Sequence, residues 1–407
     1  MKPFTGYVSC LAFSLLFSCK KQTGANIPPS SKDSFLVTVN NGYGSGKYKV
    51  GDTVHIFTSH YATNQLFDKW SGDTSLLDGA EEWHTWFVMP GKNITVTGSI
   101  KNISSFTLQY ETIRGRDRLK PVYYYLPPGH KGVVYLLHGT NGAAATLVSD
   151  YEFQQLIKTL VSDNFGIIVT EAEEARVDAN ADGKLRWALL PMDTALNVDY
   201  ANIRAISDTF YNRGLMARSR PRYSVGMSDG GYFSVALSYM YHFKAGVNYC
   251  AQGSPGIIQL TTIPTQFCMA RNDNNPSIGP VGNADALTYS KNLNARGICS
   301  KYFINERSPI YPERFARSEE ISTDLSISIF NELQSKGYID SKRYYIGYSD
   351  AFINALQSNP SAFPVINSLS LLQKLFVLEQ INLSVSDHHM YSDYDRAMLH
   401  FLNNQCQ

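Results

Sequence analysis

The chain has 407 residues, of which 43% are hydrophobic and 13% aromatic, enough to bury the cores of two or three domains. This composition excludes a chain that is disordered over most of its length. Its 36 lysines and arginines nearly balance 35 aspartates and glutamates. Because no basic cluster could follow a phosphate backbone, a nucleic-acid partner is not expected.

The first residues have the pattern of an export signal. A lysine at position 2 precedes an apolar stretch over residues 7–17, and Cys19 is followed by two lysines. The apolar stretch is too short to span about 30 Å of hydrocarbon, which favours a cleaved signal over a membrane helix. Residues 1–18 resemble a bacterial lipoprotein signal peptide. The resemblance implies lipidation of Cys19 and anchoring at the cell envelope, on the outer membrane or cell surface. A simple secretory signal is the alternative.

A polar segment and a small β module are expected next. Residues 19–33 are polar and contain prolines, as in a tether. Residues 34–102 contain short β-branched and aromatic runs between glycine-rich turns, which predict an all-β module. Residues 41–48 and 67–73 in it resemble the divergent internalin-type B repeat of bacterial surface proteins. The resemblance implies that Trp70 is a buried core residue, and sugar binding by aromatic side chains is the alternative.

Strand and helix patterns alternate over residues 105–407, which predicts an α/β domain with a mainly parallel sheet. The expected strands are apolar runs over residues 132–137, 166–170, 222–225, 245–250 and 266–270. Apolar residues at three- and four-residue spacing predict amphipathic helices between them, over residues 151–163, 198–213 and 231–242.

A candidate nucleophile follows one of these strands. Residues 226–230 read Gly-Met-Ser-Asp-Gly, the G-x-S-x-G spacing of a nucleophile elbow. Glycines two before and two after the serine remove the Cβ atoms that would collide in so sharp a turn. The pattern predicts Ser228 as the nucleophile of an acyl transfer, and an ordinary glycine-rich turn is the alternative.

A base must accept the serine proton, and in the chain order Ser, Asp, His it follows the nucleophile. His242 ends a predicted helix and His400 lies within the last one, so both are assigned to packing or the surface. Two adjacent histidines remain, in a polar turn before the last helix. This turn resembles the catalytic loop of serine exopeptidases and esterases, which favours His388 as the base, with His389 as the alternative.

The acid and the oxyanion hole are expected on loops that leave core strands. Asp273 follows an apolar strand and would orient the imidazole, and a solvated loop carboxylate is the alternative. Developing negative charge would be bound by the backbone amides of Asp229 and Thr140. The latter follows a His-Gly turn in which His138 is expected to orient the loop. Asp387 is a weaker candidate acid because it adjoins the histidine in sequence.

With these motifs in order, residues 105–407 resemble the α/β-hydrolase superfamily, nearest to polyhydroxybutyrate depolymerases and feruloyl or acetylxylan esterases. The resemblance implies an α/β-hydrolase sandwich, with Trp187 and Asn141 binding substrate and no cofactor. The long segment before the histidine departs from the family pattern. Its excess, about residues 305–384, is helical in pattern and is expected to form a cap over the pocket or, alternatively, a helical buttress.

The expected function is therefore that of a secreted, lipid-anchored serine esterase acting on acyl esters such as acetyl or feruloyl groups on polysaccharide. A prolyl-type serine peptidase is one alternative, since the histidine turn also resembles those enzymes. A non-catalytic glycan-binding or adhesion lipoprotein is another.

Two further features concern metal and disulfides. Residues 178–183 read Asp-Ala-Asn-Ala-Asp-Gly, the first half of a calcium loop, whose ligands would be Asp178, Asn180 and Asp182. Position twelve is Leu189 instead of glutamate, which favours a plain polar loop.

An exported protein can keep disulfides. Cys250 and Cys268 lie in apolar runs, so a Cys299–Cys406 bridge is expected.

Overall fold

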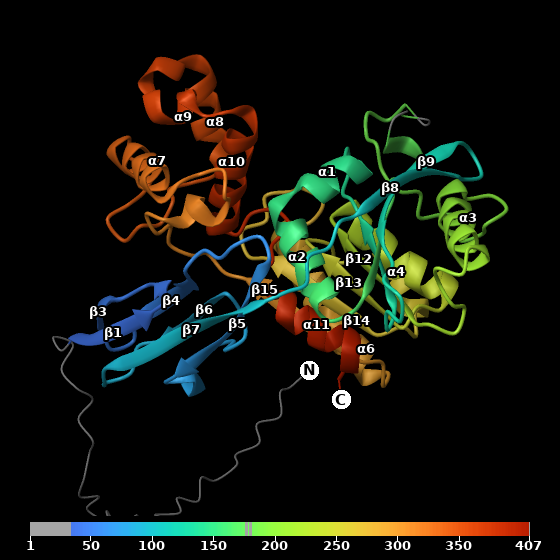
Figure 1. Ribbon diagram of the computed structural model, residues 1–407, viewed down its shortest axis with the longest axis horizontal. Helices are drawn as coiled ribbons and strands as arrows, with labels where there is room; N and C mark the ends of the chain where they lie inside the picture. The colour runs from blue at the N-terminus through green and yellow to red at the C-terminus, as the bar shows by residue number, and fades with distance from the viewer. Residues whose placement is uncertain (1–33, 176–177, 179–180, 407) are drawn as a thin grey trace, which may run out of the picture.

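The computed structural model describes residues 34–175, 178 and 181–406. The signal peptide and tether expected over residues 1–33, with Cys19, lie outside the described residues, as does Asn180. The ribbon has a β module, an α/β body and a helical insertion that lies beside the module (Figure 1). Within the described ranges, no helix is both long and apolar enough to cross a membrane.

The β module consists of two small sheets. The first has the order β3 (Gly46–Lys49), β1 (Ser34–Asn40), β7 (Ile94–Asn102), β5 (Gln65–Gly72). The second has the order β2 (Gly42–Tyr43), β4 (Thr53–Thr58), β6 (His84–Val88). Trp70 is 2% exposed in the module core, and its indole donates a hydrogen bond to the carbonyl of Glu82 over 3.0 Å. Its predicted burial is confirmed.

The body is built on one eight-stranded sheet whose strands from β10 to β15 run parallel. The mainly parallel sheet predicted from sequence is confirmed. At one end of the sheet, β9 pairs antiparallel with β11, and β8 pairs antiparallel with β9 and forms the edge. The order across the sheet is β15 (Ser300–Asn305), β14 (Thr265–Ala270), β13 (Ala245–Tyr249), β12 (Arg222–Met227), β10 (Val133–Leu137), β11 (Gly166–Val169), β9 (Leu119–Tyr125), β8 (Gln109–Arg114).

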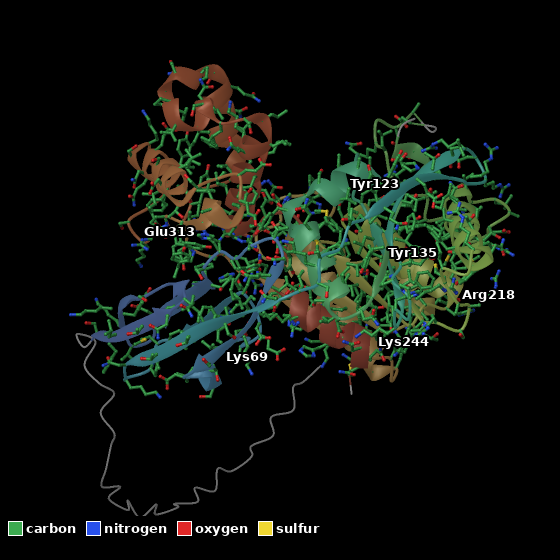
Figure 2. All side chains as sticks on the ribbon, in the orientation of Figure 1. Lys69, Tyr123, Tyr135, Arg218, Lys244 and Glu313 are labelled. Carbon is green, nitrogen blue, oxygen red and sulfur yellow. A yellow bond between two sulfur atoms is a disulfide. The ribbon has the colours of Figure 1, made fainter. Side chains whose placement is uncertain are left out.

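Helices cover both faces of this sheet, which explains why its central strands are mainly apolar and buried. Successive residues of β10 face opposite layers, so Val134 packs with one helix layer and Tyr135 with the other. The tyrosine (Figure 2) shares a 2.7 Å hydrogen bond with Ser207 of α3. The first layer contains α1 (Ala144–Ser149), α2 (Tyr151–Ser162) and α11 (Asp395–Asn404). The second contains α3 (Val198–Asn212), α4 (Asp229–Tyr241), α5 (Pro255–Leu260) and α6 (Gly279–Ala295).

The helical insertion follows β15 and has its own apolar core. Its helices are α7 (Thr323–Ser335), α8 (Ser349–Ser358), α9 (Pro364–Ser368) and α10 (Leu371–Val385), with short 3-10 turns at Arg314–Arg317 and Pro360–Ala362. It contacts the β module, because Tyr311 stacks on Tyr43 with ring centroids 4.7 Å apart.

Polar contacts join the β module to the body. Nδ1 of His84 lies 2.5 Å from the carboxylate of Asp393, and both side chains are 6% exposed. At the other side of this interface, Nε2 of His400 lies 2.6 Å from Glu81.

One disulfide joins Cys299 to Cys406, as expected from sequence. Cys250 and Cys268 are free and buried. The disulfide therefore connects the residue before β15 to the segment that follows α11.

Candidate active site

Ser228 is the single residue between the end of β12 and the start of α4. Its φ of 56° and ψ of −121° place it in a strained turn, as a nucleophile elbow requires. A Cβ on Gly230 would lie 2.3 Å from the carbonyl oxygen of Leu137, and one on Gly226 would lie 2.0 Å from the carbonyl oxygen of Gly230. The two glycines of the motif therefore permit the close approach that exposes the serine.

The structure brings Ser228, His388 and Asp273 together. Nε2 of His388 lies 2.9 Å from Oγ of Ser228, and Nδ1 of the same ring lies 2.7 Å from Oδ2 of Asp273. The hydroxyl can donate to Nε2 while Nδ1–H donates to the carboxylate, which is the tautomer a general base needs. The arrangement is that of a Ser-His-Asp catalytic triad.

Asp273 is 3% exposed on the loop that leaves β14. Its second carboxylate oxygen accepts a hydrogen bond from the backbone amide of Asn275 over 2.9 Å. Both oxygens are thus engaged, and the carboxylate is fixed against the imidazole instead of being solvated.

The loop before His388 is joined to the loop that carries the acid. The backbone amide of Arg271 donates to Oγ of Ser386 over 2.8 Å. Asp387 accepts hydrogen bonds on Oδ1 from the amide of Asn274, over 3.0 Å, and from the amide of His388, over 2.6 Å. Asp387 therefore positions the base through the backbone. Sequence reasoning considered it only as a rival acid and missed this contact.

His389, the alternative base, is directed away from Ser228. Its Nε2 lies 3.6 Å from Oε1 of Glu379 and 3.8 Å from Oδ2 of Asp150. Burial lowers the pKa of His389, but Glu379 and Asp150 outweigh burial and raise its pKa to about 9. His388 Nε2, and not His389, contacts Ser228 Oγ, so the geometry assigns the role of base to His388.

The cavity around Ser228 has a volume of about 660 Å³, within the roughly 300–1,000 Å³ of small-molecule sites. We refer to it as the Ser228 cavity. Thr140, Asn141 and Asp229 all line it, as does His388. The two residues predicted to supply oxyanion amides thus lie beside the serine. Asn141 is bonded twice to Leu185: its backbone amide donates to the Leu185 carbonyl over 2.6 Å, and its side-chain Oδ1 accepts from the Leu185 amide over 3.0 Å.

Trp187 does not line this cavity, contrary to the expectation that it binds substrate. Its side chain is 2% exposed and stacks on Phe233 with ring centroids 4.7 Å apart. The indole donates to the carbonyl of His138 over 2.9 Å, and the Trp187 backbone amide donates to Oδ2 of Asp229 over 2.6 Å. The residue is therefore a core residue that supports the elbow. Burial raises the pKa of the Asp229 carboxyl to about 6.

His138 orients the loop of the oxyanion hole, as its place before the serine predicts. Its Nδ1 lies 2.8 Å from the carbonyl of Gly139, and its Nε2 accepts a hydrogen bond from the amide of Ala172 over 3.0 Å. Burial lowers its pKa to about 4. The ring is therefore neutral, with both nitrogens engaged.

The insertion contributes none of the residues that line the Ser228 cavity. The expectation that residues 305–384 cover the pocket is therefore corrected. Its contacts fit the alternative of a buttress, because Arg317 pairs with Glu152 of α2 over 2.7 Å and Tyr151 of the same helix donates to the Arg317 carbonyl over 2.8 Å.

Two side-chain groups among the described residues could offer ligand atoms to a metal. One is Cys250, Asp273 and His388, and the other is Asp150, Glu379 and His389. The first contains two members of the triad, which already bond to each other. In the second, His389 Nε2 lies 3.6 Å from Glu379 and 3.8 Å from Asp150, and these neighbours raise the pKa of His389.

In the loop proposed for calcium, the carboxylate of Asp178 accepts hydrogen bonds from the backbone amides of Asp182, over 3.2 Å, and Gly183, over 2.7 Å. Asp182 is also paired with Arg186. These contacts are those of a polar turn. Because Asn180 lies outside the described residues, the calcium site stays a prediction.

No protein-family model and no curated protein matches the chain. Similar solved structures include a dienelactone hydrolase from Anabaena variabilis, at 12% identity and a TM-score of 0.36, covering 50% of this chain and 87% of that chain. They include a ferulic acid esterase, at 11% identity and a TM-score of 0.38, covering 49% of this chain and 89% of that chain. An acylaminoacyl peptidase from Pyrococcus horikoshii is 12% identical with a TM-score of 0.38, covering 76% of this chain and 56% of that chain.

The sheet topology, the strand-serine-helix elbow and the chain order Ser228, Asp273, His388 are those of the α/β-hydrolase fold.

Proposed function

We propose that the chain is a serine esterase that hydrolyses carboxylic esters through Ser228. The observation that carries the proposal is the hydrogen-bonded series from Ser228 through His388 to Asp273, over 2.9 and 2.7 Å. A serine hydroxyl is a weak nucleophile on its own and becomes effective when an oriented imidazole accepts its proton in the transition state.

The reaction follows from this geometry in two steps. Ser228 Oγ attacks the ester carbonyl while His388 Nε2 accepts its proton, and the imidazolium then donates that proton to the departing alcohol. Water, deprotonated by the same nitrogen, hydrolyses the acyl-enzyme. Asp273 stabilises the imidazolium at both stages. The backbone amides of Thr140 and Asp229 are proposed to bind the oxyanion of each tetrahedral intermediate.

Acyl groups on polysaccharide, such as acetyl or feruloyl esters, are the proposed substrates. The Ser228 cavity is not bounded by the insertion, which leaves room for an alcohol that is part of a polymer. Its wall combines Tyr232 and Leu189, suited to an aromatic acyl group, with polar residues such as Asn275.

The test is hydrolysis of p-nitrophenyl acetate, methyl ferulate and acetylated xylan by the protein and by Ser228→Ala. We expect the variant to lose at least about 10³-fold in turnover. The matched control is Ser254→Ala at the start of α5, where the side chain makes no capping hydrogen bond, and it should retain activity. Unchanged hydrolysis by Ser228→Ala would refute the proposal.

A peptidase is the competing hydrolase, because the same triad cleaves amides. Turnover of an aminoacyl-proline amide in preference to all three esters would favour it. The esterase proposal requires a higher kcat/KM for at least one ester than for the aminoacyl-proline amide.

We further propose that the protein is exported and anchored through a lipid on Cys19. The support is the sequence pattern of residues 1–21. Metabolic labelling with a radioactive fatty acid should mark the wild-type protein and leave Cys19→Ala unlabelled. Labelling that survives in the variant would contradict the anchor at this residue.

A further inference from the structure

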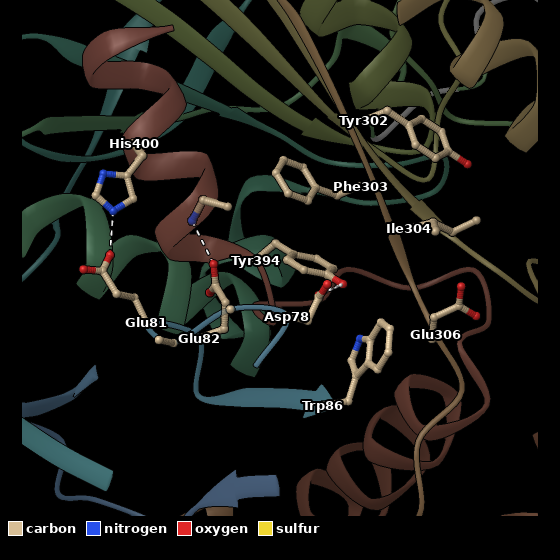
Figure 3. Close-up of a pocket in the computed structure, with 13 residues that line it drawn as sticks. Asp78, Glu81, Glu82, Trp86, Tyr302, Phe303, Ile304, Glu306, Tyr394 and His400 are labelled. Atoms are coloured by element: carbon tan, nitrogen blue, oxygen red, sulfur yellow. Dashed lines mark hydrogen bonds and ion pairs between the residues drawn. The ribbon is translucent and has the colours of Figure 1, made fainter. Parts of the chain in front are cut away.

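Carboxylates line two large cavities of the protein and serve different purposes in them. In the cavity between the β module and the body, carboxylates join these two parts of the chain (Figure 3). Glu81 is paired with His400, and Glu82 accepts a hydrogen bond from the backbone amide of Ala397. Among the described residues that line the Ser228 cavity, the one carboxylate is that of Asp229, the residue after the nucleophile. Its place beside the reacting group makes it a candidate for a contact with substrate.

The side chain of Asp229 borders the Ser228 cavity from the first turn of α4. Asp229 is the first residue of that helix, and Tyr232, three residues further on, lines the same cavity. Residues at this spacing share one face of a helix. The carboxylate therefore lies on the face of α4 that borders the cavity, and the positive end of the helix dipole favours its ionised form.

The protein uses only one of the two carboxylate oxygens of Asp229. Oδ2 accepts the hydrogen bond from the backbone amide of Trp187 over 2.6 Å, which fixes the direction of the side chain. Oδ1 has no hydrogen-bond partner within the described ranges, and it is not one of the unpaired polar atoms that are closed off from solvent. A ligand in the Ser228 cavity can therefore reach Oδ1.

The free oxygen of this carboxylate is best satisfied by a hydrogen-bond donor. Burial raises the pKa of the Asp229 carboxyl to about 6. At pH 8 the group is therefore mostly ionised, and an ionised carboxylate accepts hydrogen bonds and donates none. A donor on the substrate would offset the cost of holding this charge away from water, since hydrogen bonds to charged groups are stronger than neutral ones.

The charges around the cavity favour a neutral donor close to the ester. Lys184 and Arg186 also line the cavity, although Arg186 is paired with Asp182. A substrate ammonium group would therefore meet the charge of Lys184, whereas a substrate carboxylate would be repelled by Asp229. A hydroxyl carries no charge and can donate to Oδ1. Because adjacent Cα atoms are about 3.8 Å apart, the carboxylate serves a hydroxyl near the ester and not one at the remote end of a long substrate.

We propose that Asp229 makes the Ser228 cavity selective for esters in which the carbon next to the esterified one carries a free hydroxyl, as in a singly acylated sugar ring. Oδ1 accepts the hydrogen bond from that hydroxyl. The side chain thus determines specificity, in addition to the contact proposed between its backbone amide and the oxyanion. The inference rests on the proposed esterase function and adds the feature of the alcohol that the site selects.

The test compares trans-2-hydroxycyclohexyl acetate with trans-2-fluorocyclohexyl acetate at pH 8. Fluorine is close to a hydroxyl in size but cannot donate a hydrogen bond. Each kcat/KM is divided by the rate constant for hydrolysis of the same ester by hydroxide, which removes the difference in intrinsic reactivity. We expect the wild type to prefer the hydroxy ester by about tenfold or more, the effect of one hydrogen bond to a charged group.

Two variants assign this preference to a residue. Asp229→Asn keeps an oxygen for the Trp187 amide but turns an NH2 group toward the cavity, so the preference should fall below about threefold. The matched control is Asp285→Asn in α6. Asp285 raises the pKa of Tyr232 but does not line the cavity. Its variant removes the same charge nearby and should keep the preference of the wild type.

A second measurement needs no variant. Hydrolysis of p-nitrophenyl acetate by the wild type should be inhibited more strongly by trans-1,2-cyclohexanediol than by trans-2-fluorocyclohexanol. Equal inhibition would overturn the inference, as would equal hydrolysis of the two esters by the wild type, an unchanged preference in Asp229→Asn, loss of the preference in Asp285→Asn, or a preference for acetylcholine over the hydroxy ester. Failure to hydrolyse any ester, p-nitrophenyl acetate included, would instead overturn the esterase proposal and this inference with it.

Discussion

Arg317 of the insertion donates a hydrogen bond to Glu152 of α2 over 2.7 Å, with side chains 6% and 0% exposed. The same carboxylate accepts from Nε2 of Gln380 over 3.0 Å and from the backbone amide of Ser392 over 3.0 Å. Glu152 thus joins α2, two parts of the insertion and the loop that follows His388.

Removing the charge of Glu152 should destabilise the protein strongly. In Glu152→Gln the guanidinium of Arg317 stays buried without its counter-ion, and such a loss lowers the free energy of unfolding by about 3–5 kcal/mol. Urea denaturation measures it. Glu111→Gln is the matched control, since Glu111 and Arg213 form a pair that is 27% and 44% exposed, and it should cost less than about 1 kcal/mol. Equal losses of unfolding free energy in the two variants would mean that the buried pair stabilises the protein no more than the exposed pair does.

Disturbing His388 through Asp273 should reduce activity far more than replacing the adjacent His389. Asp273→Asn leaves His388 in the wrong tautomer, and we expect kcat on p-nitrophenyl acetate to fall about 10⁴-fold with KM little changed. His389→Gln removes a ring that faces Glu379 and Asp150, and kcat should change less than about tenfold. A larger loss in His389→Gln than in Asp273→Asn would reverse the assignment of the base.

His389 should also make stability depend on pH. Its pKa is about 9 in the folded protein and about 6.5 when unfolded, so the folded state binds more protons between these values. The stability that the charged ring confers is therefore complete below pH 6.5 and is lost as the pH rises through 9. The groups that face the ring are Glu379, Asp150 and Glu152.

Free energies of unfolding at pH 6.5 and pH 9.5 test this prediction. The decrease in the wild type should be smaller in His389→Gln and unchanged in His60→Gln, which alters an exposed histidine of the β module. The same decrease in all three proteins would assign the pH dependence to other groups.

Gly230, two residues after the nucleophile, should not tolerate a side chain. A Cβ on Gly230 would lie 2.3 Å from the Leu137 carbonyl oxygen, which is backbone and cannot move aside. We expect Gly230→Ala to lower the free energy of unfolding by about 3 kcal/mol or more. At Gly256 in α5 a Cβ meets nothing within 4 Å, so Gly256→Ala should be neutral or stabilising by up to about 1 kcal/mol. A stable, active Gly230→Ala protein would contradict the close approach at the elbow.

Local sequence patterns were sufficient for the elements that place the triad. The central strands are mainly apolar and buried, and the glycines around Ser228 and the polar turns at Asp273 and His388 follow one another in a recognisable chain order. The same reasoning did not predict β8, β9 and β15, which lie at the two ends of the sheet and are partly exposed.

Contacts between distant segments were not accessible from sequence. The roles of Glu152 and Asp387 depend on partners more than a hundred residues away, and no local pattern marks them. The family resemblance implied that Trp187 contacts substrate, but its stacking on Phe233 depends on how α4 packs. The preference for His388 over His389 came from a resemblance, because the direction of each ring in a turn depends on the surrounding helices.

The Cys299–Cys406 disulfide fastens one edge of the large sheet to the last helix. It adjoins β15 and follows α11. Among the described residues, no disulfide joins the strands and loops that carry Ser228, Asp273 and His388 to one another. A thiol reductant would therefore release the end of α11 from β15 while leaving the contacts among these three residues without a covalent bond to lose.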